Sequence, residues 1–289
     1  MPEVAVVSDT TAYLPSEVTE ENGISLVSLY VNFGAGDTQR EADIRDYAAF
    51  FDRLRSANEW PTTSQPSVGD FIEVYEPLLA EGRDVVSIHI SGGLSGTHES
   101  ARQAREALER DGKGGERVHV MDSSTAAGGL GMVVLAAARS AARGADAASV
   151  VAAAKQAREE LKMWFAIDTL EFLKRSGRIG AASAWIGSTL KIKPILTVES
   201  EISPIERVRT SARAFERMVD YARQRKASDA DGWVVQHIQS DEQGRKLADR
   251  CREIFECEPL YYSEIGPVLG VHTGPGLLGV GSVTARHYE

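Results

Sequence analysis

The chain has 289 residues, 43% of them hydrophobic, a length that suits one large domain or two medium α/β units. Its net charge of -10 argues against contact with nucleic acid or anionic membranes, because both require a basic surface. No apolar stretch reaches the roughly 20 residues that cross a bilayer and no signal-peptide pattern opens the chain, so we expect a cytoplasmic protein without stable membrane insertion.

Strand-like and helix-like segments alternate along the first half of the chain. The apolar runs predicted as strands are residues 4–7, 24–31, 85–90 and 118–121. The amphipathic or alanine-rich segments predicted as helices are residues 44–54, 69–79, 99–108, 130–143 and 146–162. This alternation is typical of α/β proteins with a doubly wound parallel sheet. We therefore predict a Rossmann-like N-terminal domain over residues 1–162.

The second half is less regular and predicts a smaller α/β domain with a mixed sheet over residues 163–289. Strands are expected at residues 164–167, 192–198, 202–208, 233–238, 260–262 and 268–271. The strands on either side of residues 199–201 should form a hairpin. Helices are expected at residues 170–174, 211–226 and 242–255, the last with Asp241 as its N-cap.

A loop rich in glycine and hydroxyl groups, with the sequence SGGLSGT at residues 91–97, lies between a predicted strand and a predicted helix. Its three glycines allow a tight turn and a close approach of the backbone to a ligand, and the free N–H groups at the helix start favour an anion. The loop therefore predicts a carboxylate or phosphate site. The alternative is an ordinary strand-to-helix turn with a serine or threonine cap.

Two further polar loops belong to the same half. The sequence PTTSQPS at residues 61–67 holds hydroxyl groups between two prolines, and SDTT at residues 8–11 follows the first predicted strand. Loops after neighbouring strands of an open α/β sheet form one crevice, where ligands usually bind. We therefore expect the three loops to share a crevice, although residues 61–67 alone would also suit a helix cap.

A glycine- and proline-rich segment near the C-terminus, residues 266–276, contains His272. This histidine is either structural or a hydrogen-bond donor to the anion. Glycines 274, 276 and 279 formally spell G-x-G-x-x-G, but too little chain follows for the rest of a dinucleotide site. The histidines show no paired spacing, and Cys251 and Cys257 are interpreted as ordinary helix-end residues, so no metal site is predicted.

Ser95 also lies in a near match to the nucleophile elbow G-x-S-x-G, with Thr97 in place of the last glycine. No acidic partner is evident between Ser95 and His272 in hydrolase-like order. Two alternatives to simple carboxylate binding therefore stay open. One is a serine-dependent lipid-ester hydrolase that uses Ser95 and His272, and the other is a phosphate-ligand sensor that uses the glycine-rich loop.

Five dispersed motifs together resemble the DegV family. They are, in chain order between residues 3 and 283, SDTTAYLP, PTTSQPS, SGGLSGT, LEFLKRSGRIG and GPVLGVHTGPG. The resemblance implies a two-domain fold that binds one long-chain fatty acid, such as palmitate or oleate, with no cofactor. It also implies a partner, because the FakB members of this family present their fatty acid to a separate ATP-dependent fatty-acid kinase, which makes the acyl phosphate for phospholipid metabolism.

The resemblance also assigns residues to this role. The carboxylate contacts that it implies are Thr63, Ser95 and His272. The secondary members of the ligand loops are Ser64, Gly96, Thr97 and Arg209. For Arg175 and Arg178 it implies either docking of the kinase or a salt bridge between domains.

A long acyl chain would supply most of the affinity, because its burial contributes roughly 0.8 kcal/mol per CH2. The polar loops would satisfy the carboxylate, and a protonated His272 would also offset its charge. The chain has no Walker motif, so it is expected to be a lipid-binding subunit and not an enzyme. Candidates for the lining of the acyl tunnel are Leu170, Phe172, Ile179, Ile186 and Leu190.

Overall fold

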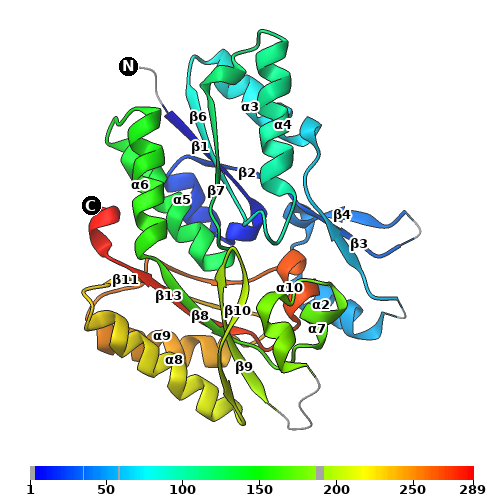
Figure 1. Ribbon diagram of the computed structural model, residues 1–289, viewed down its shortest axis with the longest axis vertical. Helices are drawn as coiled ribbons and strands as arrows, with labels where there is room; N and C mark the ends of the chain where they lie inside the picture. The colour runs from blue at the N-terminus through cyan, green and yellow to red at the C-terminus, as the bar shows by residue number, and fades with distance from the viewer. Residues whose placement is uncertain (1–3, 35, 58, 187–191) are drawn as a thin grey trace.

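The structure is a computed structural model, and it describes the chain except for residues 1–3, 35, 58 and 187–191. Within the described residues the strands form three sheets (Figure 1). Their strand orders are β2-β1-β6-β7, β10-β9-β8-β13-β11-β12 and β4-β3-β5. Helices cover the outer faces of the two larger sheets, and the third sheet projects to one side.

The first sheet is parallel at every strand pair, as predicted. Its strands are β1 (Val4–Asp9), β2 (Ile24–Val27), β6 (Asp84–His89) and β7 (Val118–Asp122). β1 is buried at every position and β6 at all but its first, because helices cover both faces of the sheet. The Rossmann-like character of this half is confirmed.

Two pairs of helices enclose this sheet. α3 (Val68–Ala80) and α4 (Thr97–Arg110) pack on one face, while α5 (Ala127–Ala142) and α6 (Ala147–Glu160) pack on the other. α1 (Ser16–Glu21) follows the short 3-10 turn after β1. α3 begins with a capping box, in which Ser67 and Asp70 accept hydrogen bonds from each other's backbone N–H. Its start therefore fixes where the preceding polar segment ends.

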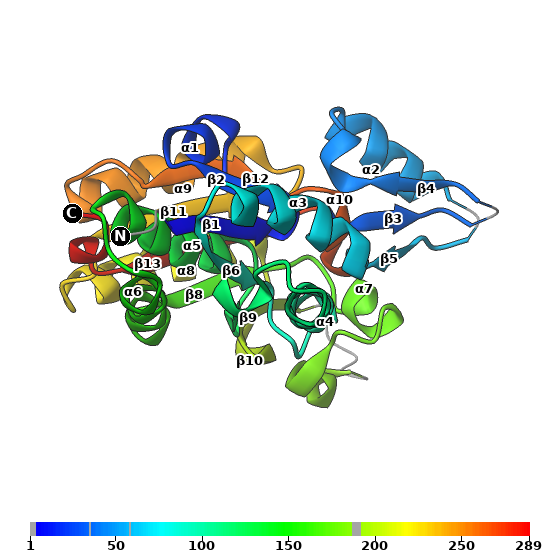
Figure 2. The same cartoon turned by 90° about the horizontal axis from the view of Figure 1, so that it is seen from above.

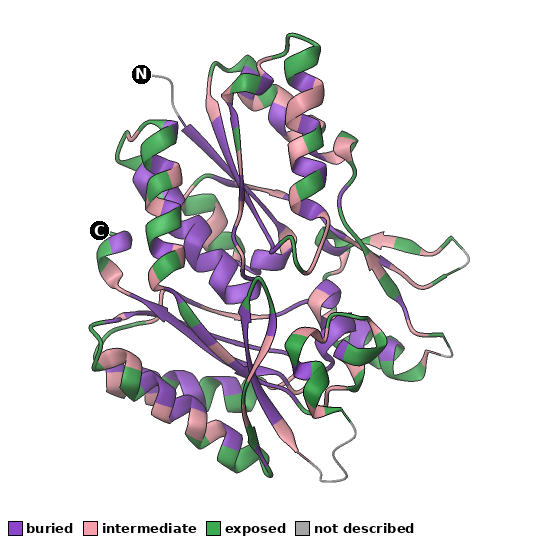
Figure 3. Cartoon of the chain, viewed as in Figure 1, coloured by how far each residue is buried: buried purple, intermediate pink, exposed green. Residues whose placement is uncertain are grey.

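The second sheet is mixed, as predicted: only the β11–β12 pair is parallel among its described pairs. Its strands are β8 (Lys162–Ala166), β9 (Lys193–Glu199), β10 (Glu201–Val208), β11 (Gly232–His237), β12 (Tyr261–Glu264) and β13 (Leu278–Val283). α8 (Ser211–Lys226) and α9 (Asp241–Phe255) cover one face. The other face meets α5 and the first half of the chain in a shared hydrophobic core (Figure 3).

The third sheet and its neighbours were not predicted. Residues 24–31, expected as one strand, divide into β2 and β3 (Tyr30–Asn32), which belong to different sheets. β3 pairs with β4 (Thr38–Arg40) and with β5 (Thr62–Ser64). Figure 2 shows this small sheet beside α2 (Tyr47–Ser56). Part of the expected 61–67 loop is therefore a strand, which holds its side chains in a fixed direction.

Two predictions for the C-terminal third are wrong. Residues 268–271, expected as a strand, lie in the helix α10 (Pro267–Thr273), whose first residue is a proline that suits a helix start. The prediction also has no strand at β13, which lies in the middle of the second sheet. A smaller correction concerns α9, in which Ser240 occupies the N-cap and Asp241 is the first helical residue.

The two larger sheets divide the sequence close to the predicted domain boundary. Strands of the parallel sheet come from residues 4–122, and strands of the mixed sheet from residues 162–283. α10 nevertheless lies against α2, β3 and β5 of the first half, and against α7 (Glu171–Arg175). Division at residues 162 and 163 stays a prediction.

Candidate functional site

A largely apolar pocket lies where the two larger sheets face each other. The space between its lining residues, including the solvent at its open mouth, is about 970 Å³. α5 and the ends of the first sheet supply Ile90, Ala126 and Ala127. The pocket face of the second sheet supplies Met163, Phe165, Val198, Ile202 and Val234. α10 and the segments beside it supply Ile265, Val268, Leu269 and Leu277.

Two glycines of β13 leave room on the floor of the pocket. Gly279 lies opposite Phe165 of β8, and Gly281 lies opposite Met163. All four residues line the pocket, whereas Val280, between the two glycines, packs in the core on the other face of the sheet. Since successive side chains of a strand point to opposite faces, β13 presents bare backbone to the pocket.

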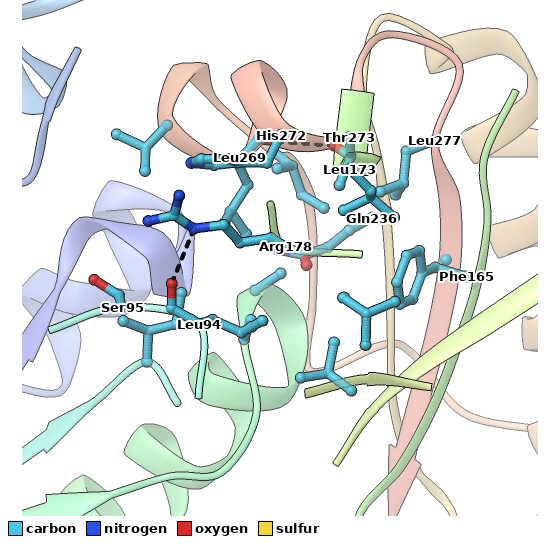
Figure 4. A pocket seen from close by; sticks show the side chains of 18 of the residues that line it. Leu94, Ser95, Phe165, Leu173, Arg178, Gln236, Leu269, His272, Thr273 and Leu277 are labelled. Atoms are coloured by element: carbon cyan, nitrogen blue, oxygen red, sulfur yellow. Dashed lines mark hydrogen bonds between the residues drawn. The ribbon is translucent and has the colours of Figure 1, made fainter. Parts of the chain in front are cut away.

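Polar side chains from three distant segments line the pocket, and Figure 4 shows two of them, Ser95 and His272. Thr63 comes from β5, Ser95 from the loop before α4, and His272 from α10. Thr63 Oγ1 and His272 Nε2 lie 2.7 Å apart and share a hydrogen bond. Ser64 also lines the pocket. The three residues that the sequence resemblance singled out therefore line one pocket.

His272 is a neutral imidazole in this structure. Burial, together with the positive charge of Arg178, lowers its pKa to about 4. Its Nδ1 atom is buried and has no hydrogen-bond partner among the described residues. This shift disfavours the protonated imidazole at neutral pH, and a charge-offsetting role for His272 beside a bound anion stays a prediction. Its contact in this structure is the hydrogen bond between Nε2 and Thr63 Oγ1.

The glycine-rich loop approaches the 61–67 segment closely, as expected. A Cβ atom at Gly96 would lie 2.5 Å from the amide nitrogen of Gln65, so a larger residue would displace the end of the Gln65 side chain. Ser95 Oγ lies 2.8 Å from Thr97 Oγ1 and accepts a hydrogen bond from the Thr97 backbone N–H. Thr97 is fully buried and serves as the first residue of α4. Ser95 is thus held at the start of a helix, where an anion is favoured.

The third polar loop, residues 8–11, does not line the pocket, which corrects the expected crevice of three loops. The Asp9 carboxylate accepts hydrogen bonds from the backbone N–H of Thr11 and of Ile90. Ser8 Oγ donates to the Ile88 backbone carbonyl. These side chains satisfy buried backbone groups, and this accounts for their polar character.

The arginines separate into different environments. Arg178 lines the pocket, with Nε 3.4 Å from the Leu94 carbonyl and Nη1 2.7 Å from the Ser176 carbonyl. The guanidinium of Arg175 lies over the ring of Trp60, 4.9 Å from its centroid, and does not line the pocket. Arg209 is exposed and also lies outside the pocket lining.

The residues expected to line the acyl tunnel do not line the pocket where the structure describes them. Leu170, Phe172, Ile179 and Ile186 do not belong to the described lining of the pocket. Phe172 instead packs against Trp60, with ring centroids 5.0 Å apart, and Ile186 is 41% exposed. Leu190 lies outside the described residues.

The described side chains do not form a hydrolase arrangement in the pocket. The Ser95 hydroxyl is hydrogen-bonded to Thr97, and the His272 imidazole is hydrogen-bonded to Thr63. No hydrogen bond between Ser95, the expected nucleophile, and His272, the expected base, is found among the described residues. A serine–histidine–aspartate chain exists elsewhere: Ser87 Oγ lies 2.6 Å from His89 Nε2, and His89 Nδ1 lies 3.0 Å from Asp9 Oδ2.

That chain of three residues is fully buried in the first sheet, with 0% exposure at each member. A substrate cannot reach it, so it serves to satisfy buried polar groups. Among the residues that the structure describes, no group of histidine, cysteine and carboxylate side chains is arranged to hold a metal ion. No helix in the described ranges is long and apolar enough to span a membrane.

Glu41 is a buried carboxyl group that joins the His272 helix to the first half of the chain. It accepts hydrogen bonds from Thr10 Oγ1 at 2.5 Å, Tyr13 Oη at 2.7 Å and the Val268 backbone N–H at 2.7 Å. Burial raises its pKa to about 7, although these three donors act in the opposite direction. A substantial fraction of this carboxyl is therefore protonated near neutral pH.

We expect the free energy of unfolding to fall as the pH rises from 4.5 to about 7. In this range the folded chain holds a proton on Glu41 that the unfolded chain has released, and the loss should be about 3 kcal/mol. Glu41→Gln keeps an oxygen acceptor but cannot ionise, so it should flatten this decline. Urea unfolding of both proteins across this pH range measures the difference. Parallel pH profiles would contradict the assignment.

The comparisons with known proteins agree over the whole chain. The family model described as "Uncharacterised protein, DegV family" matches residues 3–285. A DegV domain-containing protein of Streptomyces coelicolor is 39% identical over 283 residues, which cover 96% of this chain and 97% of the relative.

Two solved structures have similar folds. One, described as "Fatty Acid Binding of a DegV family Protein from Thermus thermophilus", is 34% identical with a TM-score of 0.85, and the match covers 98% of this chain and 99% of that one. The other, described as DegV, a fatty acid binding protein from Bacillus subtilis, is 30% identical with a TM-score of 0.87. That match covers 98% of this chain and 100% of the other.

Proposed function

The chain belongs to the DegV family, and we propose that it binds one long-chain fatty acid, such as palmitate or oleate, between its two larger sheets. The observation that carries this proposal is the division of the pocket into an apolar interior and a polar side. A fatty acid has the same division. Both solved relatives described above are described as binding fatty acid, which supports the proposal.

The acid's carboxylate would lie against Thr63 and Ser95. If the neutral His272 carries its proton on Nε2, it donates to Thr63 Oγ1, and the Thr63 hydroxyl then has its own hydrogen free for a ligand oxygen. Ser95 would contribute a second hydroxyl. The backbone at Gly96, at the start of α4, would contribute the positive end of a helix dipole. Hydrogen bonds to a charged group are the stronger ones, which offsets the cost of partial burial.

Arg178 would supply the positive charge that His272 lacks. It is the one lysine or arginine among the described lining residues, and its charge already affects His272. It is exposed, so solvent weakens its attraction for the carboxylate. We therefore assign Arg178 to the ligand site and keep Arg175, which lies outside the pocket, for contact with a partner. Arg209 was expected in the ligand loops but also lies outside the pocket, so we reassign it to partner contact.

Calorimetric titration with palmitate tests this assignment. We expect Arg178→Gln to weaken binding by about threefold to tenfold at low salt, with a smaller effect at high salt. Arg175→Gln is the matched control, because it removes the same charge from the same segment outside the pocket. Equal losses in the two variants would contradict a specific role for Arg178, and failure of the parent chain to bind palmitate would contradict the proposed function.

The fatty acid would be presented to an ATP-dependent fatty-acid kinase in the cytoplasm. Support comes from the mouth of the pocket, where the exposed residues Ser64, Gln65 and Arg178 lie on the carboxylate side. The reactive end of the ligand would thus be the end nearest the surface. The chemistry belongs to the kinase in this account. Formation of acyl phosphate by the loaded chain with ATP alone would contradict this division of labour.

A further inference from the structure

Gln236 is a polar side chain in the apolar part of the pocket. It lies on β11 and lines the pocket together with Val234, while Val235, between them, packs in the core on the opposite face of the sheet. Gln236 is 3% exposed. In Figure 4 it lies on the side of Phe165, away from Ser95. A binding site for a plain acyl chain has no need of an amide at this position.

The hydrogen bonds of Gln236 are incomplete. Its Nε2 donates to Ser263 Oγ at 2.8 Å, whereas its buried Oε1 has no partner among the described residues. If the amide were turned over, the nitrogen would be left without a partner instead. One polar atom of this side chain is therefore unpartnered in either orientation.

The unpartnered atom is buried beside Gly128 of α5, next to side chains that line the pocket. A Cβ atom placed on Gly128 would be 2.8 Å from Gln236 Oε1, 3.0 Å from Met163 Cε and 3.1 Å from Val234 Cγ2. These three side-chain atoms therefore converge on one point, and the residues to which they belong all line the pocket. Across the strand pair, Gln236 is opposite Gly279, which has no side chain to shield the amide.

A buried polar atom without a partner is unfavourable, and native proteins satisfy nearly all such groups. An unsubstituted acyl chain would leave the amide unpaired. A hydroxyl on the chain would pair with it in either amide orientation, because a hydroxyl both donates and accepts. From this juxtaposition of an unpartnered amide and a largely apolar pocket, we propose that the pocket selects long-chain fatty acids that carry a hydroxyl group along the chain, away from the carboxylate. This inference rests on the proposed function.

Competition titrations with stearate, 12-hydroxystearate and 2-hydroxystearate test the inference, because the three acids differ only in the hydroxyl. We expect the 12-hydroxy acid to bind the parent chain at least about fivefold more tightly than stearate. The 2-hydroxy acid should show no such advantage, since its hydroxyl lies beside the carboxylate. Gln236→Leu should reverse the order, because the buried hydroxyl then has no partner.

Ile205→Met is the matched control, because Ile205 is exposed on β10 outside the pocket lining, and the variant should keep the preference of the parent chain. Gln236→Met gives a second test of the reversal in case the leucine variant does not fold. Equal binding of stearate and 12-hydroxystearate by the parent chain would overturn the inference and leave the proposed function standing. A preference that survives in both Gln236 variants would also overturn it. Failure of all three acids to bind would remove the proposed function and the inference together.

Discussion

Palmitate should bind this chain about a thousandfold more tightly than decanoate. The two acids share the carboxylate and differ by six CH2 groups, and each buried CH2 contributes about 0.8 kcal/mol. The difference is therefore about 5 kcal/mol, somewhat more than a thousandfold in Kd. The lining between the two larger sheets is largely apolar, so each added CH2 group is expected to be buried there. Displacement of a fluorescent fatty acid by saturated acids of increasing length measures the slope of the binding free energy against chain length.

A variant that fills the pocket should remove most of this slope. Val198 is 7% exposed and lines the pocket on β9, so Val198→Phe places a ring in the space of the acyl chain. Ile205, on the neighbouring strand β10, is 39% exposed, and Ile205→Phe is the matched control that should keep the parent slope. An affinity that does not depend on chain length in the parent would mean that the acyl chain lies outside the pocket.

Thr63→Val should weaken palmitate binding by about tenfold to a hundredfold. Valine has nearly the shape of threonine and lacks its hydroxyl, and a hydrogen bond to a charged group is worth about 1.5–3 kcal/mol. Thr62→Val is the matched control, because Thr62 is the neighbouring residue of β5 but does not line the pocket. Calorimetry on both variants measures the loss. Equal affinities in the two variants would place the carboxylate elsewhere.

The hydrogen bond between Thr63 and His272 predicts that the effects of changing the two residues are coupled. If His272 acts by orienting the Thr63 hydroxyl, His272→Ala should weaken binding in the parent but have little further effect in Thr63→Val. Independent contacts with the ligand would instead give additive losses. If His272 instead contacts the ligand through its unpartnered Nδ1, the losses of affinity in the two single variants should add in the double variant.

The parallel sheet was predictable because its strands are short apolar runs between polar or glycine positions. β1 and β6 are buried on both faces, so consecutive residues such as 4–7 and 85–86 are apolar and do not alternate with polar ones. The helices around the sheet have apolar residues at helical spacing for the same reason. Both patterns arise from residues that are neighbours in the chain, so they can be read from a single sequence.

β13 and α10 were not predictable by the same reasoning. β13 presents Gly279 and Gly281 to the pocket, and a strand that uses glycine to leave space lacks the side chains by which strands are usually identified. α10 contains Val268, Leu269 and Val271, which suit a strand equally well, and its helical state depends on packing against α2, β3 and β5. In both cases a distant contact decides the local structure.

The candidate site was predictable where its residues belong to recognisable loops. Thr63, Ser95 and His272 were expected to meet, and all three line the pocket. The positions of Arg178 and Gln236 in the pocket lining were not predicted, because both depend on how the two larger sheets face each other. Hydroxyl- and glycine-rich loops are visible in a sequence, whereas the lining of a cavity between two sheets is not.

The central claim is that this chain holds one long-chain fatty acid, and mass spectrometry of the purified protein tests it most directly. The intact protein is weighed under native conditions and then denatured, and any released small molecule is identified. We expect one fatty acid per chain, retained by Ile205→Phe and lost or weakened in Val198→Phe. A chain that releases no fatty acid and takes up neither added palmitate nor added oleate would contradict the claim.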